Sequence, residues 1–66
     1  MANVEDDSMV RLTVQGIVVY TRFANFLELN QISKTEEWKI KGKLEQGKAY
    51  HGGGGSLASW KIELDA

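Results

Sequence analysis

The first apolar stretch of the chain, residues 9–20, alternates between apolar and polar positions before it becomes continuously apolar. Apolar residues occupy every second position from Val10 to Val14, as in a strand with one buried face. After Gly16, three consecutive β-branched residues at 17–19 place apolar groups on both faces. Glycine is favoured where a strand bends or bulges. The pattern predicts one long strand that bends at Gly16 and serves two surfaces.

Two interpretations compete for the next apolar segment. As a helix at about 22–33, Phe23 and Phe26 would share one face. As a strand over residues 25–32, alternate leucines would point inward with a glutamate between them. The strand avoids leaving Leu29 on the wrong side, so we favour the strand and keep the helix as the alternative.

Two later segments alternate strictly, and both contain the tripeptide Trp-Lys-Ile. In residues 37–46 and again in 57–65, every second residue is apolar or glycine and most residues between them are charged. Ser33 begins a capping-box pattern, but a long helix would scatter the apolar residues that follow it. We therefore predict a loop or a single helical turn there, and then two neighbouring strands with Trp38 and Trp60 in one core.

These patterns predict a mainly β fold, a small antiparallel barrel or sheet of four or five strands of the OB or SH3 kind. An α+β fold with one helix at about 22–33 is the alternative. The predicted core consists of the inward-facing residues Val10, Leu12, Val14, Val18, Leu27, Leu29, Trp38, Ile40, Leu44, Trp60, Ile62 and Leu64. Ile17 and Val19 fall on the opposite face, to be covered by the second half of a barrel or by another copy of the chain.

The two remaining segments lack any apolar periodicity. Residues 1–8 are polar and acidic, and we expect a disordered arm before a single domain at 9–66. Residues 47–56 contain four consecutive glycines, which predict a flexible loop. The unit Gly-Gly-Gly-Gly-Ser at 52–56 is also typical of a linker inserted by protein engineering.

Length and charge exclude only a few classes of protein. A chain of 66 residues without cysteine has a small core and no disulfide or thiolate site. The net charge is −1, but residues 10–66 carry eight Lys or Arg against six Asp or Glu. No window of about 18 residues is continuously apolar, and the first residues do not resemble a signal peptide. We expect a soluble, cytoplasmic protein.

Catalytic, metal and cofactor sites are not expected. His51 is the single histidine and lies beside the glycine run, where nothing would hold it in place for proton transfer. A metal site would need further histidine or cysteine ligands. The glycine run lacks the Gly-Lys-Ser/Thr ending of a phosphate-binding loop. The adjacent carboxylates Glu36 and Glu37 would point apart in a strand.

The main functional hypothesis is based on a row of lysines. In a strand, Lys39, Lys41 and Lys43 would lie on one side at intervals of about 6–7 Å. Such a row, with Arg22 and an aromatic such as Tyr20, would track the phosphates of a single-stranded nucleic acid and stack its bases. The simpler explanation is that the lysines only solvate an outward face and discourage edge pairing.

One resemblance supports this hypothesis. The spacing Val14-x-Gly16-x-Val18, followed by Arg22 and Phe26-Leu27-Glu28-Leu29, resembles the first two strands of oligonucleotide/oligosaccharide-binding (OB) barrels. The match covers about a third of the chain and implies nucleic-acid binding on a face that would expose Lys39 to Lys43. The chain departs from the family in having four clear strands where five are usual, and no obvious helix after the third.

We therefore expect a non-enzymatic binding module for single-stranded nucleic acid, with neither a metal nor a membrane as partner. The alternative is a structural or protein-interaction module that self-assembles into a homo-oligomer through exposed strand edges and its second apolar face.

Overall fold

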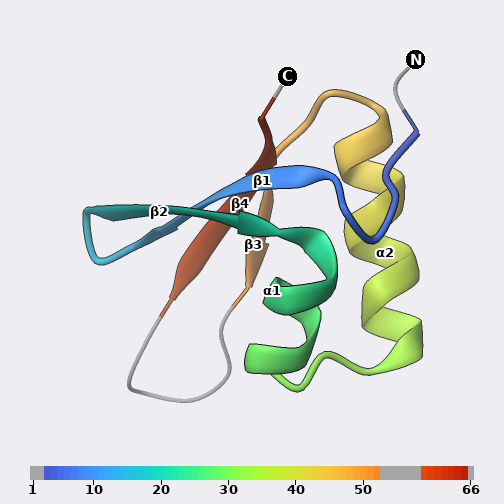
Figure 1. Ribbon diagram of the computed structural model, residues 1–66, viewed down its shortest axis with the longest axis horizontal. Helices are drawn as coiled ribbons and strands as arrows, with labels where there is room; N and C mark the ends of the chain where they lie inside the picture. Colours follow the sequence, from blue (N-terminus) through green and yellow to red (C-terminus); the bar gives the residue numbers. More distant parts are fainter. Residues whose placement is uncertain (1–2, 53–58, 66) are drawn as a thin grey trace.

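The computed structural model describes residues 3–52 and 59–65, which form an antiparallel sheet with two helices on one face (Figure 1). The elements are β1 (Met9–Val14), β2 (Ile17–Arg22), α1 (Phe23–Leu29), α2 (Lys34–Glu45), β3 (Tyr50–Gly52) and β4 (Trp60–Leu64). The strand order is β2-β1-β4-β3. Antiparallel pairing of four strands is confirmed for the described residues. The OB-like or SH3-like barrel is wrong, because the sheet stays open and the fold is α+β.

Residues 9–20 form most of a hairpin and not one bent strand. Gln15 and Gly16 have φ values of 50° and 82°, as a type I′ turn between two strands requires. The chain reverses there, so that Thr13 pairs with Val18 and Leu12 with Val19. The sequence signal at Gly16 was real, but it marks a full reversal. As a result Val18, which we expected in the core, lies on the face opposite Leu12 and is 48% exposed.

Residues 25–32 are not a strand, and the helical alternative is correct in kind, though α1 is shorter than expected. Phe23 and Phe26, three residues apart, are both fully buried, which anchors the helix to the sheet. The helix ends at Leu29, and the side chain of the next residue, Asn30, donates a hydrogen bond to the carbonyl of Phe26 at 3.0 Å. Leu29 is 78% exposed, so the chain accepts the exposed leucine that had favoured the strand.

The strand predicted at 37–46 is also wrong, because this segment lies in α2. Ser33 caps the helix by accepting a hydrogen bond from the backbone N–H of Glu36 at 3.2 Å. Ile40 and Leu44 are four residues apart, so they fit one helical face as well as one strand face, and both are buried. Trp38, two residues from Ile40, is consequently turned outward and is 78% exposed.

The last predicted strand is confirmed within the described residues as β4, which lies between β1 and β3. Trp60 packs edge-on against Phe26, with ring centroids 5.1 Å apart, and against Tyr50 at 6.1 Å. β3 falls inside the segment that we expected to be a flexible loop. The rest of that predicted loop, residues 53–56, lies outside the described residues. Of the proposed linker at 52–56, only Gly52 is described.

The acidic segment at 3–8, expected as part of a disordered arm, packs against both helices. Val4 is buried, and its N–H donates to the carboxylate of Glu45 on α2 at 3.1 Å. The N–H groups of Phe23 and Ala24, in the first turn of α1, donate to the carbonyls of Ser8 and Asp6. These bonds satisfy donors that Arg22, the residue before the helix, does not cap with its side chain.

The core lies between the covered face of the sheet and the helices. Its fully buried members come from the N-terminal segment, two strands and both helices: Val4, Val10, Phe23, Phe26, Ile40, Leu44 and Ile62. The β1–β2 turn projects beyond the helices (Figure 1). This is why Ile17 and Val19 are 66% and 50% exposed although they lie on the covered face with Leu12 and Val14.

Candidate nucleic-acid interface

The structure does not form the predicted lysine row. Two residues correspond to about 200° around a helix axis, so Lys41 lies roughly opposite Lys39 and Lys43 on α2. Lys39 and Lys43 are one turn apart and exposed, whereas Lys41 is half-buried. The prediction therefore selected two residues that share a surface and one that does not.

The outward side of α2 gathers cations and carries no carboxylate among its exposed residues. This outer face of α2 consists of the exposed residues Lys34, Thr35, Trp38, Lys39 and Lys43. The three glutamates of the helix, Glu36, Glu37 and Glu45, are half-buried. Glu45 is also engaged by the N–H of Val4. The charge of the outer face is therefore positive, although the chain as a whole is weakly acidic.

A shallow hollow marks the first two turns of this face. It has a volume of about 460 Å³ and is lined by Lys34, Thr35, Trp38 and Lys39. The indole of Trp38 contributes a large apolar surface between two ammonium groups. The sequence analysis missed Lys34, Thr35 and Trp38 because it predicted a strand with Trp38 in the core and a loop or single helical turn before it. The capping pattern at Ser33 was the signal that would have found them.

The connection between the helices fixes how α2 is presented. Residues 30–33 join α1 to α2, and Gln31 has a φ of 52°, in the left-handed region. The N–H of Ile32 donates to the carbonyl of Leu27 at 3.0 Å, which closes the end of α1. Residues 30–33 thus form a four-residue connection that leads from α1 directly into α2, the helix that carries the outer face.

The other two predicted contact residues, Arg22 and Tyr20, lie elsewhere. Tyr20 is 56% exposed on the open face of the sheet, the face opposite the helices, so it does not join the lysines. The guanidinium of Arg22 donates to the backbone carbonyl of Asp7 at 2.9 Å. These contacts place Arg22 at the junction of β2, α1 and the N-terminal segment, apart from the outer face of α2.

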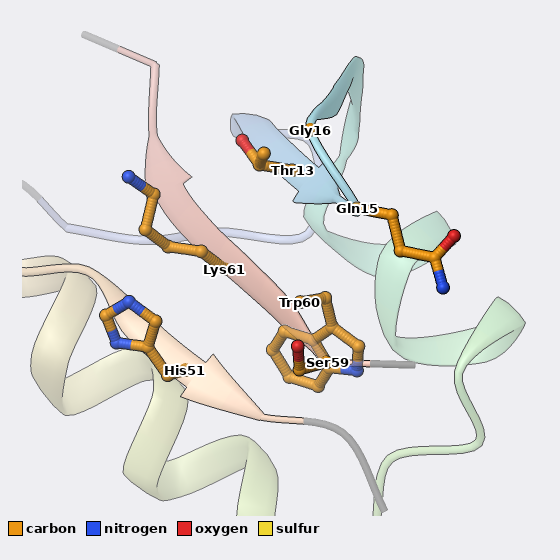
Figure 2. Close-up of a pocket in the computed structure, with 7 residues that line it drawn as sticks. All are labelled: Thr13, Gln15, Gly16, His51, Ser59, Trp60 and Lys61. Atoms are coloured by element: carbon orange, nitrogen blue, oxygen red, sulfur yellow. The ribbon is translucent and has the colours of Figure 1, made fainter. Parts of the chain in front are cut away.

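A second hollow lies beside the middle strands and has a volume of about 300 Å³. Its lining residues are Thr13, Gln15, Gly16, His51, Ser59, Trp60 and Lys61, shown in Figure 2. His51 and Lys61 are register partners on β3 and β4, and the Gln15 amide points away from both (Figure 2). The lining offers polar groups and one cation but no carboxylate that would serve as a partner for His51 in acid–base chemistry.

The open face has its own charge cluster. Arg11 donates to the Glu63 carboxylate at 3.0 Å, and the Lys61 ammonium lies 3.5 Å from the same oxygen. The hydrogen bond from Arg11 holds the pKa of Glu63 below its ordinary value, and the same bond raises the pKa of Arg11. Lys61 and Arg11 are thus balanced by a carboxylate on this face.

Two kinds of site are not seen in the described part of the chain. Within the two described ranges, 3–52 and 59–65, no group of three His, Cys, Asp or Glu side chains lies close enough together to hold a metal ion. No helix in these ranges is long and apolar enough to cross a membrane. Comparisons of the chain with known protein families, with curated proteins and with solved structures found no match.

Proposed function

We propose that the protein binds nucleic acid without catalysis, and that α2 enters the major groove of duplex DNA with its outer face. The observation that carries the proposal is that Lys34, Lys39 and Lys43 share the outer face of α2, the second of two consecutive helices, with the exposed Trp38. In helix-turn-helix proteins the second helix reads base edges while its neighbour crosses the phosphate backbone, and we assign these roles to α2 and α1.

The dimensions and chemistry of the outer face suit this task. A helix with its side chains is about 10–12 Å across, close to the width of about 12 Å of the major groove. Lysines at the flanks would neutralise phosphates, and the hydroxyl and methyl groups of Thr35 would reach base edges. Ile40 and Leu44 hold the opposite side of the helix against the core, so this face is presented on a fixed support.

The duplex replaces the single strand of the original hypothesis for a geometric reason. An extended strand would have spaced three ammonium groups evenly along a single-stranded backbone. The helix instead groups Lys39 and Lys43 one turn apart and turns Lys41 away. Single-stranded nucleic acid therefore becomes the comparison that the experiment must include.

The test is fluorescence anisotropy with a labelled mixed-sequence duplex and its single strand, each at about 50 and 200 mM salt. The duplex is expected to bind more tightly, and its affinity should fall steeply with salt. Replacing both Lys39 and Lys43 by Gln should reduce the slope of log K against log salt by about 2, since each lost phosphate contact removes about 1. Trp38→Ala should weaken binding at both salt concentrations.

Lys61→Gln is the matched control, since it removes the same charge from the open face of the sheet, opposite the helices. Circular dichroism of each variant would confirm that the fold is retained. Equal losses for Lys61→Gln and for the outer lysines would contradict the proposed face. Tighter binding of the single strand would overturn major-groove docking, and no binding of either nucleic acid at low salt would overturn the function.

A further inference from the structure

Strand β2 is an edge strand without the usual protection. It stands at one end of the strand order, and no strand in the described part of the chain pairs with its outer side. Natural edge strands are commonly blunted by lysine, proline, a bulge or short length. Residues 17–21 contain neither charge nor proline, and β2 is six residues long. The opposite edge, β3, has only three residues.

Both faces of β2 are apolar and exposed. Side chains alternate along a strand, so Ile17 and Val19 lie on the covered face while Val18 and Tyr20 lie on the open face. Their exposed fractions run from 48% for Val18 to 66% for Ile17. A strand that only shields a core has one polar face. The composition of β2 instead suits a strand with a neighbour on its outer side.

The hairpin determines which backbone groups point outward. In a hairpin with a two-residue turn, the residues flanking the turn exchange hydrogen bonds, and so does every second pair after them. Ile17 and Val19 therefore direct their N–H and C=O groups to β1, opposite Val14 and Leu12. The corresponding groups of Val18 and Tyr20 point to the outer edge.

We propose that two copies of the chain form a dimer by antiparallel pairing of β2 with β2, about a twofold axis at Val19. In this register Val19 faces Val19 of the second copy, and Val18 and Tyr20 exchange backbone hydrogen bonds with Tyr20 and Val18 of the second copy. Ile17 faces Thr21 of the second copy. Pairs of β-branched and aromatic residues across strands are favourable, and no like charges meet within the segment.

A second copy suits this edge because the segment is complementary to itself. Antiparallel pairing requires residues with outward backbone groups to face one another. Val18 and Tyr20 are such residues, and they satisfy each other when the axis passes through Val19. That register also brings all four exposed apolar residues of β2 into the interface.

The area indicates how strong the dimer is. One pair of six-residue edge strands buries less than the roughly 1,200–2,000 Å² of stable complexes, because the faces of the sheet stay open. The dimer is therefore weak and concentration-dependent. The paired sheets become continuous, and the axis is perpendicular to them, so the helices of both copies lie on the same side.

One consequence of this geometry rests on the proposed function. α1 lies against β2, while α2 packs over β3 and β4. With strands about 4.8 Å apart, α2 lies roughly 14 Å from the axis, and the two α2 helices are roughly 30 Å apart. Dimeric helix-turn-helix proteins place their second helices about 34 Å apart, one turn of DNA. The β2 dimer thus presents both outer faces of α2 to one side of a duplex.

The first test is analytical ultracentrifugation of the full chain over a concentration series without nucleic acid, so that it does not depend on DNA binding. The mass is expected to rise from 7.4 kDa towards twice that value. Val19→Lys would place two like charges together at the axis and should leave a monomer at every concentration. Leu29→Lys is the matched control, because it adds the same charge at an exposed apolar position of α1 and should still dimerise.

The second test measures the register by cysteine crosslinking, since the chain has no cysteine of its own. At the axis, Val19→Cys would bring two Cα atoms to about 4.5 Å, which suits a disulfide. Ile17→Cys would leave them about 13 Å apart, too far for a disulfide. A covalent dimer is expected for Val19→Cys alone.

Three results would overturn the proposal. A wild-type chain that remains monomeric at millimolar concentration would exclude the dimer. Equal crosslinking of Ile17→Cys and Val19→Cys would exclude the register. Dimerisation of Val19→Lys with normal circular dichroism would place the interface elsewhere.

Discussion

The tripeptide Trp-Lys-Ile occurs twice in this chain, once in helix α2 and once in strand β4, and the two copies fold differently. Ile40 and Ile62 are both fully buried. Trp38 is 78% exposed, whereas Trp60 packs against Phe26 and Tyr50. Residues two apart lie on the same side of a strand but about 200° apart on a helix. The isoleucine is the anchor in both copies, and the backbone decides whether the tryptophan joins it.

The largest expected effect comes from truncating the two tryptophans. Trp60→Ala removes a ring that contacts Phe26 and covers Gly52, and should lower the free energy of unfolding by about 3–5 kcal/mol. For so small a domain, this loss would leave much of the protein unfolded at 25 °C. Trp38→Ala should change stability by no more than about 0.5 kcal/mol, because the side chain is exposed.

Urea denaturation followed by circular dichroism measures both variants without relying on tryptophan fluorescence. Similar losses for the two substitutions would mean that Trp38 is also packed, and the comparison would fail. A Trp38→Ala variant that is stable but weak in DNA binding would instead separate the functional indole from the structural one.

Two glycines give a sharper comparison, because replacing them by alanine should change the stability of the protein in opposite directions. A Cβ at Gly52 in β3 would collide with the Trp60 ring, whereas a Cβ at Gly42 in α2 would meet nothing within 4 Å. Gly52→Ala should therefore destabilise the protein by about 1–3 kcal/mol. Gly42→Ala should stabilise it by up to about 1 kcal/mol, since alanine is the better helix former.

Thermal denaturation of the two alanine variants at matched concentration decides the signs. A higher melting temperature for Gly42→Ala would confirm that residues 37–46 are helical in solution. A lower one would favour the strand that the alternation predicted. No change for Gly52→Ala would show that the Trp60 ring does not cover β3.

The contrast between the tripeptides also explains how far the sequence predicts the fold. Alternation identified β4 because its apolar residues Trp60, Ile62 and Leu64 do share one side. The same pattern failed in α2, where Ile40 and Leu44 are spaced equally well for a helix. The capping residue Ser33 favours the helix, and its pattern was visible in the sequence. Short apolar segments of this kind are ambiguous between helix and strand until tertiary packing selects one.

The candidate site was predictable only in part. Lys39 and Lys43 were selected for their charge, which does not depend on secondary structure, and they remain together on the outer face of α2. Lys41 does not lie with Lys39 and Lys43, and Trp38 lies on the outer face and not in the core. Both errors arose because residues 37–46 were assigned to a strand and not to a helix. The turn at Gln15 and Gly16 had a similar effect on β2, since it moved Val18 out of the predicted core.

The smallest expected effect concerns the lysines of the two tripeptides. Lys61 in β4 lies 3.5 Å from the carboxylate of Glu63, which also accepts a hydrogen bond from Arg11, while Lys39 in α2 is exposed. Because Arg11 lowers the pKa of Glu63 in the folded protein, folding favours the ionised carboxylate. This contribution is present above the ordinary pKa of glutamate and is lost as the pH falls through the lower folded value.

Glu63→Gln should therefore flatten the loss of stability on acidification, measured by urea denaturation at several pH values between about 3 and 7. Glu28→Gln on α1 removes an exposed carboxylate elsewhere and serves as the control. An equal flattening by both variants would show that the Arg11–Glu63 pair contributes nothing specific, as surface ion pairs often do.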